Sequence, residues 1–380
     1  MSAACQVRII QGVEQLPEAE WQSLVSGRPA WRLEVLRTIA RYPSRPLPLT
    51  VFLLEDQSGL AGAAVCIPIV ANSAHNSLDK LLFGRAARLL RRLGASTQPV
   101  LVFQIPLSGE ASVVLRRGAA AVQQRLLDQL LDCIESHATE LKSGIAFKGV
   151  TPEDSPLWAT LRRRGYAGSE YESTACLDIQ WSDFDAYVNH LRQDSRNAAK
   201  IARNERNRNR KSGVEIRQVP CTDDVAHALY VITRDHCRHK NGWDPLYGPQ
   251  FLPQLSKALG DDLLVFEAVR AGERVAMLAV VRSGTVGWVA WVGIEMRDRP
   301  NDFTYANIVF YHPADWAPPL GLKTLLYGTA AQAAKLKRGC RLLPCYVLYR
   351  PRRRVFRWLA RPYLALHQAW FHRKRRALHA

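Results

Sequence analysis

The stretch that decides the fold is Phe303 to Tyr349, which reads FTYANIVFYHPADWAPPLGLKTLLYGTAAQAAKLKRGCRLLPCYVLY. Its first part, residues 306–316, carries an apolar face and predicts a helix that is broken at Pro313. Gly321 follows the last helical turn, where a glycine relieves backbone strain. The stretch therefore opens with a helix and a glycine turn.

The second part of this stretch predicts two strands separated by a basic element. Residues 322–327 form an apolar run before Gly328, and that run has the length of a buried strand. Residues 335–339, Lys-Leu-Lys-Arg-Gly, form the basic element. Residues 342–348 then alternate as a closing strand.

Three consecutive strands are expected before this helix, at residues 263–270, 274–282 and 285–293. Short turns separate them, which predicts an antiparallel meander. Trp288 and Trp291 are three residues apart, so a regular strand would direct their rings to opposite faces. One ring could line a substrate cleft, and the alternative is that both fill the core.

A basic helix is expected over residues 195–211, before Gly213 and a following strand. Arg196, Lys200 and Arg203 are spaced by four and three residues, so they share one helical face. Because like charges on one face repel each other, a bound anion explains the pattern. A solvated surface explains it almost as well.

These elements together resemble the FemAB-like, GNAT-fold acyltransferases, and in particular the cellulose- and exopolysaccharide-associated acetyltransferase-like group. The matching positions are Gly321, the pair Tyr327-Gly328, and Lys335 with its following Gly339. Arg196, Lys200 and Arg203 match the basic helix of the family, and the resemblance covers about residues 174–349. The family pattern has an aromatic residue before this lysine, whereas this chain has Ala334.

The resemblance implies an α+β fold with two GNAT-like domains in tandem. Each domain would hold a mixed, mostly antiparallel sheet flanked by helices. The expected divisions are an N-terminal domain at 1–180, a C-terminal acyltransferase domain at 181–349, and a basic, amphipathic aromatic tail at 350–380. A length of 380 residues also favours two domains over one.

The formal net charge is +18, and it is concentrated in particular segments. Residues 349–380 hold nine Arg, one Lys and no acidic residue, interleaved with aromatic rings, and Pro362 is expected to interrupt the segment. A helix expected at 76–93 is also basic and amphipathic, so it could lie on a membrane or pack on its own domain. The expected partners are an anionic or phosphorylated substrate and an anionic membrane surface at 350–380, with tRNA as the less favoured choice.

The N-terminus lacks the features of a secretory signal, and no apolar run has the roughly 20 residues needed to span a bilayer. We therefore expect a cytoplasmic protein, peripheral at the inner face of the cell membrane if the tail binds lipid. The eight cysteines contain no CxxC pair, which favours reduced thiols. His236 and His239 are three residues apart, a weak metal signal, and no metal is expected.

By resemblance, Lys335 is the first candidate for a catalytic residue, because it would bind a phosphate or polarise the acyl carbonyl. Tyr327 and Tyr305 could position the acceptor, next to Gly328. Asp302 and Glu295 are candidate general bases. With Trp291 and the three basic residues of the 195–211 helix, these form the expected site; the alternative for each is a packed or solvated side chain.

GNAT-fold enzymes transfer acyl groups by direct attack, and no GxSxG motif suggests a covalent intermediate here. The expected donor is acyl-CoA or another activated acyl donor, but the usual pyrophosphate-binding glycine loop is missing near residues 301–304. The leading hypothesis is an acyltransferase, specifically an N-acyltransferase, acting on an amine or hydroxyl of a cell-envelope or exopolysaccharide precursor. The alternatives are an aminoacyl-tRNA-dependent Fem-type ligase and a non-catalytic GNAT-like module that binds lipid or a protein partner.

Overall fold

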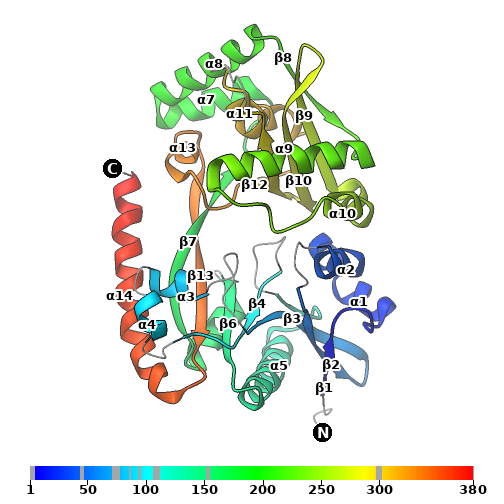
Figure 1. The fold of residues 1–380 in the computed structure, drawn as a ribbon, viewed down its shortest axis with the longest axis vertical. Coiled ribbons are helices and arrows are strands. Elements are labelled where there is room, and N and C mark those ends of the chain that lie inside the picture. Colours follow the sequence, from blue (N-terminus) through cyan, green and yellow to red (C-terminus); the bar gives the residue numbers. More distant parts are fainter. Residues whose placement is uncertain are drawn as a thin grey trace.

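A computed structural model of the chain describes residues 5–42, 47–70, 78–84, 87–92, 96–105, 112–150, 155–296 and 302–379. Its helices flank one large mixed sheet, as Figure 1 shows. The strand order is β1-β2-β3-β4-β6-β13-β7-β12-β11-β10-β9-β8, and β5 pairs with β3. Among the described strand pairs, only β4–β6 and β11–β12 are parallel. The expected α+β class with a mixed, mostly antiparallel sheet is confirmed.

The first half of the chain follows the expected order of elements, with two differences. The helix expected at 76–93 is two short helices, and its residues 76, 77, 85, 86 and 93 lie outside the described residues. The three-residue strand β5 was not expected. The elements are β1 (Gln6–Gln11), α1 (Glu18–Leu24), α2 (Leu33–Arg41), β2 (Thr50–Asp56), β3 (Gly59–Ile69), α3 (Leu78–Phe83), α4 (Ala87–Arg92), β4 (Val100–Phe103), β5 (Val113–Leu115), α5 (Ala120–Glu140), β6 (Gly144–Val150) and α6 (Pro156–Arg163).

The second half contains the expected meander and the expected helix starts. Ser195 accepts a hydrogen bond from the Ala198 backbone N–H, so it caps the basic helix. The elements are β7 (Ala167–Asp178), α7 (Phe184–Asp194), α8 (Arg196–Lys211), β8 (Val214–Val219), α9 (Asp223–Asn241), α10 (Phe251–Leu259), β9 (Leu263–Arg270), β10 (Glu273–Ser283), β11 (Val286–Ile294), α11 (Thr304–Ala306), the π-helical turn η4 (Asn307–Tyr311), α12 (Pro313–Trp316), β12 (Thr324–Leu326), α13 (Gln332–Leu336), β13 (Arg341–Arg350) and α14 (Arg354–His379).

Strands β7 and β13 connect the two halves of the sheet. They are the long vertical strands that run between the upper and lower parts of Figure 1. β13 pairs with β7 along its length and also with β6, so a strand from the end of the chain lies between two strands of the first half. The sheet is therefore continuous across residue 180, and the division into tandem domains remains a prediction.

A bulge in β11 changes the faces that its tryptophans occupy. Trp291 is opposite Ala279 and Val289 is opposite Val280, so Ala290 is an extra residue in the strand. Because of this extra residue, Trp288 and Trp291 pack on the same side of the sheet, against one core cluster. The expectation that the two rings face opposite sides was wrong, since it assumed a regular strand.

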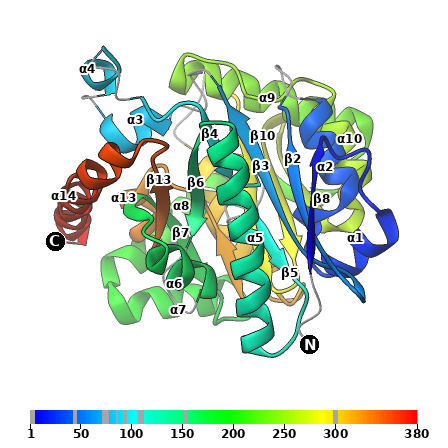
Figure 2. The same cartoon turned by 90° about the horizontal axis from the view of Figure 1, so that it is seen from below.

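The largest core cluster draws residues from both halves. Leu33 and Ile39 of α2 belong to it together with Phe251 and Leu255 of α10. At the edge of this contact, the Arg32 guanidinium donates to the Leu259 carbonyl at 2.9 Å and to Asp262 at 2.5 Å. In Figure 2, α1 and α2 lie beside α10, which matches these contacts. The two halves therefore share apolar burial, which stabilises their contact.

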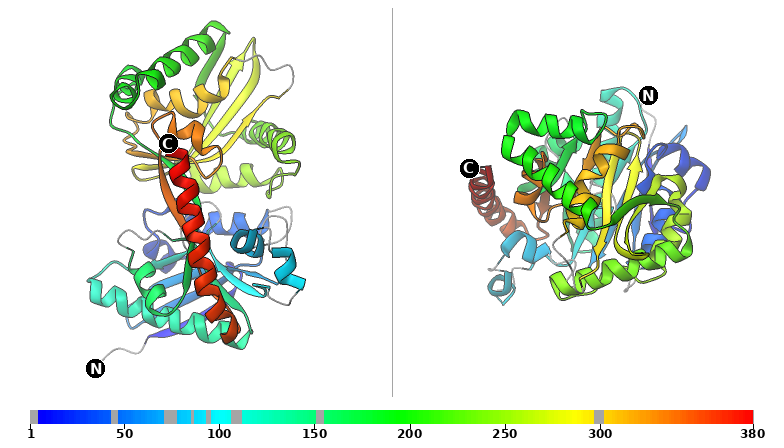
Figure 3. Two further views of the ribbon diagram at one scale, coloured as in Figure 1. Left: turned by 90° about the vertical axis from the view of Figure 1, so that its left-hand side faces the viewer. Right: turned by 90° about the horizontal axis from the view of Figure 1, so that it is seen from above.

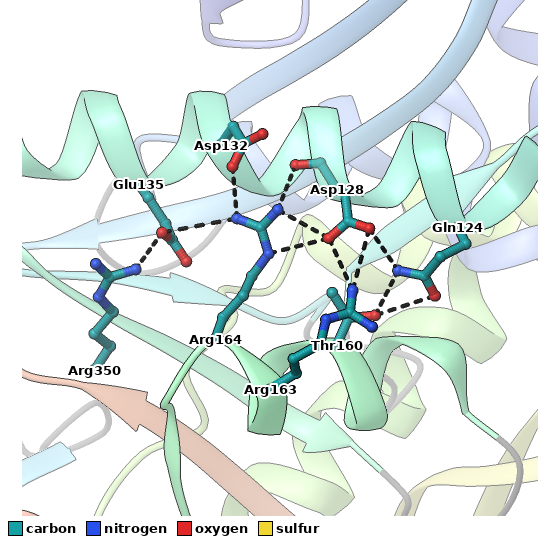
Figure 4. A network of polar contacts seen from close by, with 8 residues as sticks. All are labelled: Gln124, Asp128, Asp132, Glu135, Thr160, Arg163, Arg164 and Arg350. Carbon is teal, nitrogen blue, oxygen red and sulfur yellow. Dashed lines mark hydrogen bonds and ion pairs between the residues drawn. The ribbon is translucent and has the colours of Figure 1, made fainter.

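A network of ion pairs fixes α5 to the sheet in the first half (Figure 4). Arg164, after α6, donates to Asp128 at 2.9 Å and to Asp132 at 2.7 Å. Glu135, one helical turn further along α5, pairs with Arg350 at the end of β13. The network thus links the helix, the start of β7 and the last strand.

The C-terminal segment is a helix and not an irregular tail. Pro362 was expected to interrupt it, but α14 continues through this residue. The helix lies along β7 at the surface of the molecule, as the left view of Figure 3 shows. No helix in the described ranges is both long and apolar enough to cross a membrane.

Candidate functional site

The carboxyl ends of β6 and β12 point toward each other along β7. Val150, at the end of β6, is opposite Tyr346, which is opposite Glu170 of β7. Leu326, at the end of β12, is opposite Cys176 of β7. Both β6 and β12 also have a parallel neighbour, so the carboxyl ends of the two parallel pairs converge on residues 171–175. In α/β sheets, the carboxyl ends of parallel strands are where ligands bind.

The side chains between these ends are polar. Tyr171 is an extra residue in β7, because Glu172 is opposite Cys345 while Glu170 is opposite Tyr346. The Thr174 hydroxyl lies 3.1 Å from the Cys345 thiol. We call Lys148, Tyr171, Glu172, Thr174 and Cys345 the central group, and they lie on the sheet face of the shared core.

Lys148 is the least expected member of the central group. Its ammonium lies over the Tyr171 ring, 5.4 Å from the ring centre. Burial lowers the pKa of Lys148, and the nearby Glu172 carboxylate partly opposes this effect. No hydrogen bond joins its ammonium to another described residue. A desolvated amine beside a carboxylate is typical of functional sites.

The second parallel pair, β11 with β12, is hydrogen-bonded over only three residues of β11. β11 pairs with β12 from Val286 to Trp288, and the described strands offer no partner on that side for residues 289–294. Backbone amides along such an edge can bind an extended ligand. Trp291 lies on this part of β11 and packs 6.0 Å from the Phe251 ring.

The turn after β12 is held by Lys335. Gly328 has a φ of 63°, a left-handed conformation that glycine adopts without strain. The Lys335 ammonium donates to the Tyr327 carbonyl at 2.6 Å and to the Gly328 carbonyl at 3.1 Å. Lys335 is 4% exposed, and burial lowers its pKa to about 8. It is thus a buried clamp on the turn, with one of its three N–H groups free of these two carbonyls.

Tyr327 is buried beside this clamp. Its hydroxyl has no hydrogen-bond partner among the described residues, and burial raises its pKa well above the usual value. Its ring packs 4.9 Å from Phe310 in the π-helical turn, a feature that is frequent at functional sites. Tyr305 lies close on the other side of Phe310, at 6.5 Å. The structure therefore brings together Tyr327, Gly328, Lys335 and Tyr305.

The two candidate general bases occupy other positions. Asp302 accepts hydrogen bonds from the Thr304 hydroxyl at 2.8 Å and from the Arg270 guanidinium at 2.8 Å. These bonds make Asp302 an anchor for the start of α11. Glu295 is exposed and lines a cavity of about 870 Å³ beside α9, together with His239 and Arg274.

The three basic residues of α8 remain in solvent. Arg196, Lys200 and Arg203 are exposed, and Arg203 reaches Asp185 only at 4.0 Å. The inner side of the same helix is tied to the Lys335 segment, because Glu205 pairs with Arg338 at 2.8 Å. The expected shared face is confirmed, and its role as an anion site stays a prediction.

The spacing of His236 and His239, a weak metal signal, is not accompanied by a group of metal ligands among the described residues. His236 stacks on Tyr305, with 6.5 Å between the ring centres. No three His, Cys, Asp or Glu side chains in the described part of the chain are grouped as a metal site would require.

Sequence reasoning missed Lys148, Glu172 and Cys345. A signal was present, since Lys148 interrupts the buried strand GIAFKGV and Glu172 lies within a long strand. Charged residues inside buried strands are rare unless they have a role. Their proximity depends on β13 lying between β6 and β7, and this pairing has no local sequence signature.

Comparison with known proteins agrees with this fold. The FemAB-like family model, described as peptidoglycan biosynthesis/recognition, matches residues 12–380. Similar solved structures include the C-terminal domain (DUF2156) of a protein described as a lysylphosphatidylglycerol synthetase from Agrobacterium fabrum, with a TM-score of 0.53 and 12% identity over 92% of this chain and 95% of that one. FemX has a TM-score of 0.53 and 10% identity over 90% and 96%.

A third similar structure is L-PGS from Bacillus licheniformis, with a TM-score of 0.50 and 12% identity over 82% of this chain and 88% of that one. At these identities the likeness concerns the fold alone. No curated protein sequence matches the chain.

Proposed function

The chain belongs to the FemAB-like family, and we propose that it is an acyltransferase that moves an acyl group onto an amine or hydroxyl of a cell-envelope or exopolysaccharide precursor. The observation that carries the proposal is the convergence of two parallel strand pairs on residues 171–175 of β7. One end offers an open strand edge and a buried lysine clamp. The other end offers a desolvated lysine beside a carboxylate.

The donor is proposed to bind at the β11–β12 end. An activated acyl donor that carries amide groups, such as acyl-CoA, can extend along the unpaired edge at 289–294 and bond to its backbone. Two donors are then proposed for the acyl carbonyl: the Lys335 N–H that neither turn carbonyl accepts, and the Tyr327 hydroxyl, which has no hydrogen-bond partner among the described residues. In this arrangement, Tyr305 and Gly328 shape the donor site, and Trp291 lies on the open strand but packs in the other core cluster.

The acceptor is proposed to bind at the central group. The acceptor amine or hydroxyl attacks the acyl carbon, and its proton passes to the Glu172 carboxylate. The acyl carbonyl oxygen takes up negative charge, which a donor positioned at the β11–β12 end stabilises. The bond to the leaving group then breaks, and the Lys148 ammonium supplies the proton that the leaving group needs.

A second candidate function is the aminoacyl-tRNA-dependent ligase. The cations Arg196, Lys200 and Arg203 favour it, because a row of exposed cations on one helix face fits a nucleic-acid backbone. This alternative changes the donor and leaves the acceptor chemistry the same. Neither the acyl-CoA reaction nor the aminoacyl-tRNA reaction gives Asp302 or Glu295 a role.

Calorimetric titration of the full chain with acetyl-CoA, a longer acyl-CoA and charged tRNA tests the donor. We expect saturable binding of one of these, weakened at least about tenfold by Lys335→Met. Lys337→Met is the matched control, because Lys337 is exposed on the same segment and should bind as wild type. Binding of none of the three donors would overturn the donor site.

Transfer of the labelled acyl group to a cell-envelope extract tests the chemistry. We expect Glu172→Gln and Lys148→Met each to lower the rate by about 100-fold, with donor binding unchanged. Lys142→Met is the control for Lys148, since Lys142 is an exposed lysine just before β6. Full activity in both central-group variants would rule out this mechanism. Loss of transfer on RNase treatment would favour the tRNA donor.

A further inference from the structure

The exposed residues of α14 that the structure describes are mostly apolar, which is unusual for a helix at a protein surface. The described exposed residues follow a helical repeat along one stripe: Trp358, Pro362, Ala365, Leu366, Ala369, Trp370 and Arg373. Trp358 is 80% exposed, Leu366 72% and Trp370 55%. Six of these seven residues are apolar, so the helix exposes the kind of face that a surface helix normally buries.

The opposite face of α14 already has its contacts. Leu364 is buried in the shared core, and the Tyr363 ring lies 5.4 Å from Phe83 of α3. His367 Nδ1 is 2.7 Å from the Ser169 hydroxyl of β7. Because one face is fixed to the sheet, the exposed stripe cannot be buried by rotating the helix. Figure 3 shows α14 lying along the outside of the molecule.

The charge around this stripe is of one sign. Residues 349–380 hold nine Arg and one Lys and no acidic residue. In Figures 1 and 2, α4 lies on the same side of the molecule as α14. This short helix exposes Leu89 together with Arg88 and Arg92. Apolar rings and cations therefore occur together on this side.

We propose that the exposed stripe of α14 docks on the surface of an anionic lipid bilayer. Indole rings favour the headgroup layer, and Leu366 between them reaches the acyl boundary. Each cation near such a surface adds attraction to lipid phosphate. A second copy of the chain fits less well, because its stripe would bring a second set of cations against the first. RNA would pair with the cations but would leave the apolar stripe in water.

Sedimentation of the full chain with vesicles tests the proposal. We expect binding to vesicles of phosphatidylglycerol and phosphatidylcholine, and at least about tenfold weaker binding to phosphatidylcholine alone. The triple variant Trp358→Ala, Leu366→Ala, Trp370→Ala should bind the anionic vesicles at least about tenfold more weakly. Trp243→Ala, which removes an exposed tryptophan from the α9–α10 connection, is the control and should bind as wild type.

A charge variant separates lipid attraction from loss of structure. Arg373→Glu should weaken binding at least about fivefold, and the loss should shrink at high salt. Arg117→Glu, an exposed arginine before α5, is its matched control. Circular dichroism should show the wild-type helix content in every variant.

Three results would overturn the proposal. The first is undiminished vesicle binding by the triple variant. The second is self-association, seen by ultracentrifugation without vesicle binding, that the triple variant abolishes, because the stripe would then cover a second copy. The third is binding to RNA but not to anionic vesicles.

Discussion

The two ends that meet along β7 each hold a lysine, Lys335 buried and Lys148 partly buried, and the two lysines have different partners. Lys335 gives two of its hydrogen bonds to the carbonyls of the turn that follows β12. Lys148, near the end of β6, lies over an aromatic ring beside a carboxylate and has no hydrogen bond to another described residue. Burial lowers the pKa of both.

The difference shows that a lowered lysine pKa does not by itself identify a role. Lys335 satisfies backbone acceptors inside the protein, so most of its bonding is used to hold the turn. Lys148 has its bonding capacity available to a ligand. We therefore expect Lys335 chiefly to hold the turn after β12 in place, and Lys148 chiefly to transfer a proton. Both roles can be tested.

The largest expected effect concerns one glycine in each half of the sheet, Gly293 of β11 and Gly144 of β6. A Cβ on Gly293 of β11 would lie 2.7 Å from backbone atoms of Ile232 and Thr233 in α9. Since neither backbone can move alone, Gly293→Ala should lower the free energy of unfolding by about 3 kcal/mol. In β6, a Cβ on Gly144 would meet the Tyr349 ring at 3.1 Å, and a side chain can shift.

Urea denaturation of the two glycine variants measures this contrast. We expect Gly144→Ala to cost about 1 kcal/mol or less. Equal losses in the two variants would show that α9 does not hold β11 as closely as the structure indicates.

The next effect concerns the lysines themselves. Lys335→Met leaves the Tyr327 and Gly328 carbonyls without this donor in a buried site, so it should lower the free energy of unfolding by about 2 kcal/mol. Lys148→Met removes a desolvated charge and no hydrogen bond, so it should change stability by less than about 1 kcal/mol. Urea denaturation at pH 7 compares them, and a greater loss in Lys148→Met would reverse the assignment.

The smallest effect is a pH dependence. The folded-state pKa of Lys335 is about 8 and its ordinary value is 10.5, so between these values the unfolded chain binds more protons. The contribution of Lys335 to stability therefore rises with pH through this window. The Lys335→Met variant lacks this contribution. The amount by which its free energy of unfolding falls below that of wild type should therefore grow by about 1 kcal/mol from pH 8 to pH 9.

Matched urea denaturation curves at the two pH values measure this change. Taking the difference between variant and wild type removes the titration of the cysteines and tyrosines that both proteins share. If the difference in free energy of unfolding between variant and wild type is the same at both pH values, Lys335 keeps an ordinary pKa in the folded protein.

Local sequence signals were sufficient for most elements. The meander of β9, β10 and β11 was predicted from alternation and short turns, and a helix was expected over residues 195–211, which the structure shows as α8 with Ser195 as its cap. Both depend on interactions between residues that are close in the chain. Lys335 and Tyr327 were each candidates by resemblance, and they lie only eight positions apart in the chain.

Features that depend on distant contacts were missed. The bulges at Tyr171 and Ala290 follow from how each strand fits its partner, and they place Trp288 and Trp291 on one face. The central group was missed because its members come from β6, β7 and β13. Pro362 was expected to break the last helix, but α14 passes through it while its inner face packs on β7.

The sequence by itself determined the order of most helices and strands, because these follow from periodicity, caps and turns along the chain. Its motif positions, such as Tyr327-Gly328 and Lys335, carried the FemAB-like resemblance and the class of fold that it implies. Tertiary structure alone decided that β13 lies between β6 and β7, that two strand ends meet, and that one side of α14 remains uncovered. The physical reason is that strand pairing and burial join residues far apart in the chain, and their choice depends on the whole sheet.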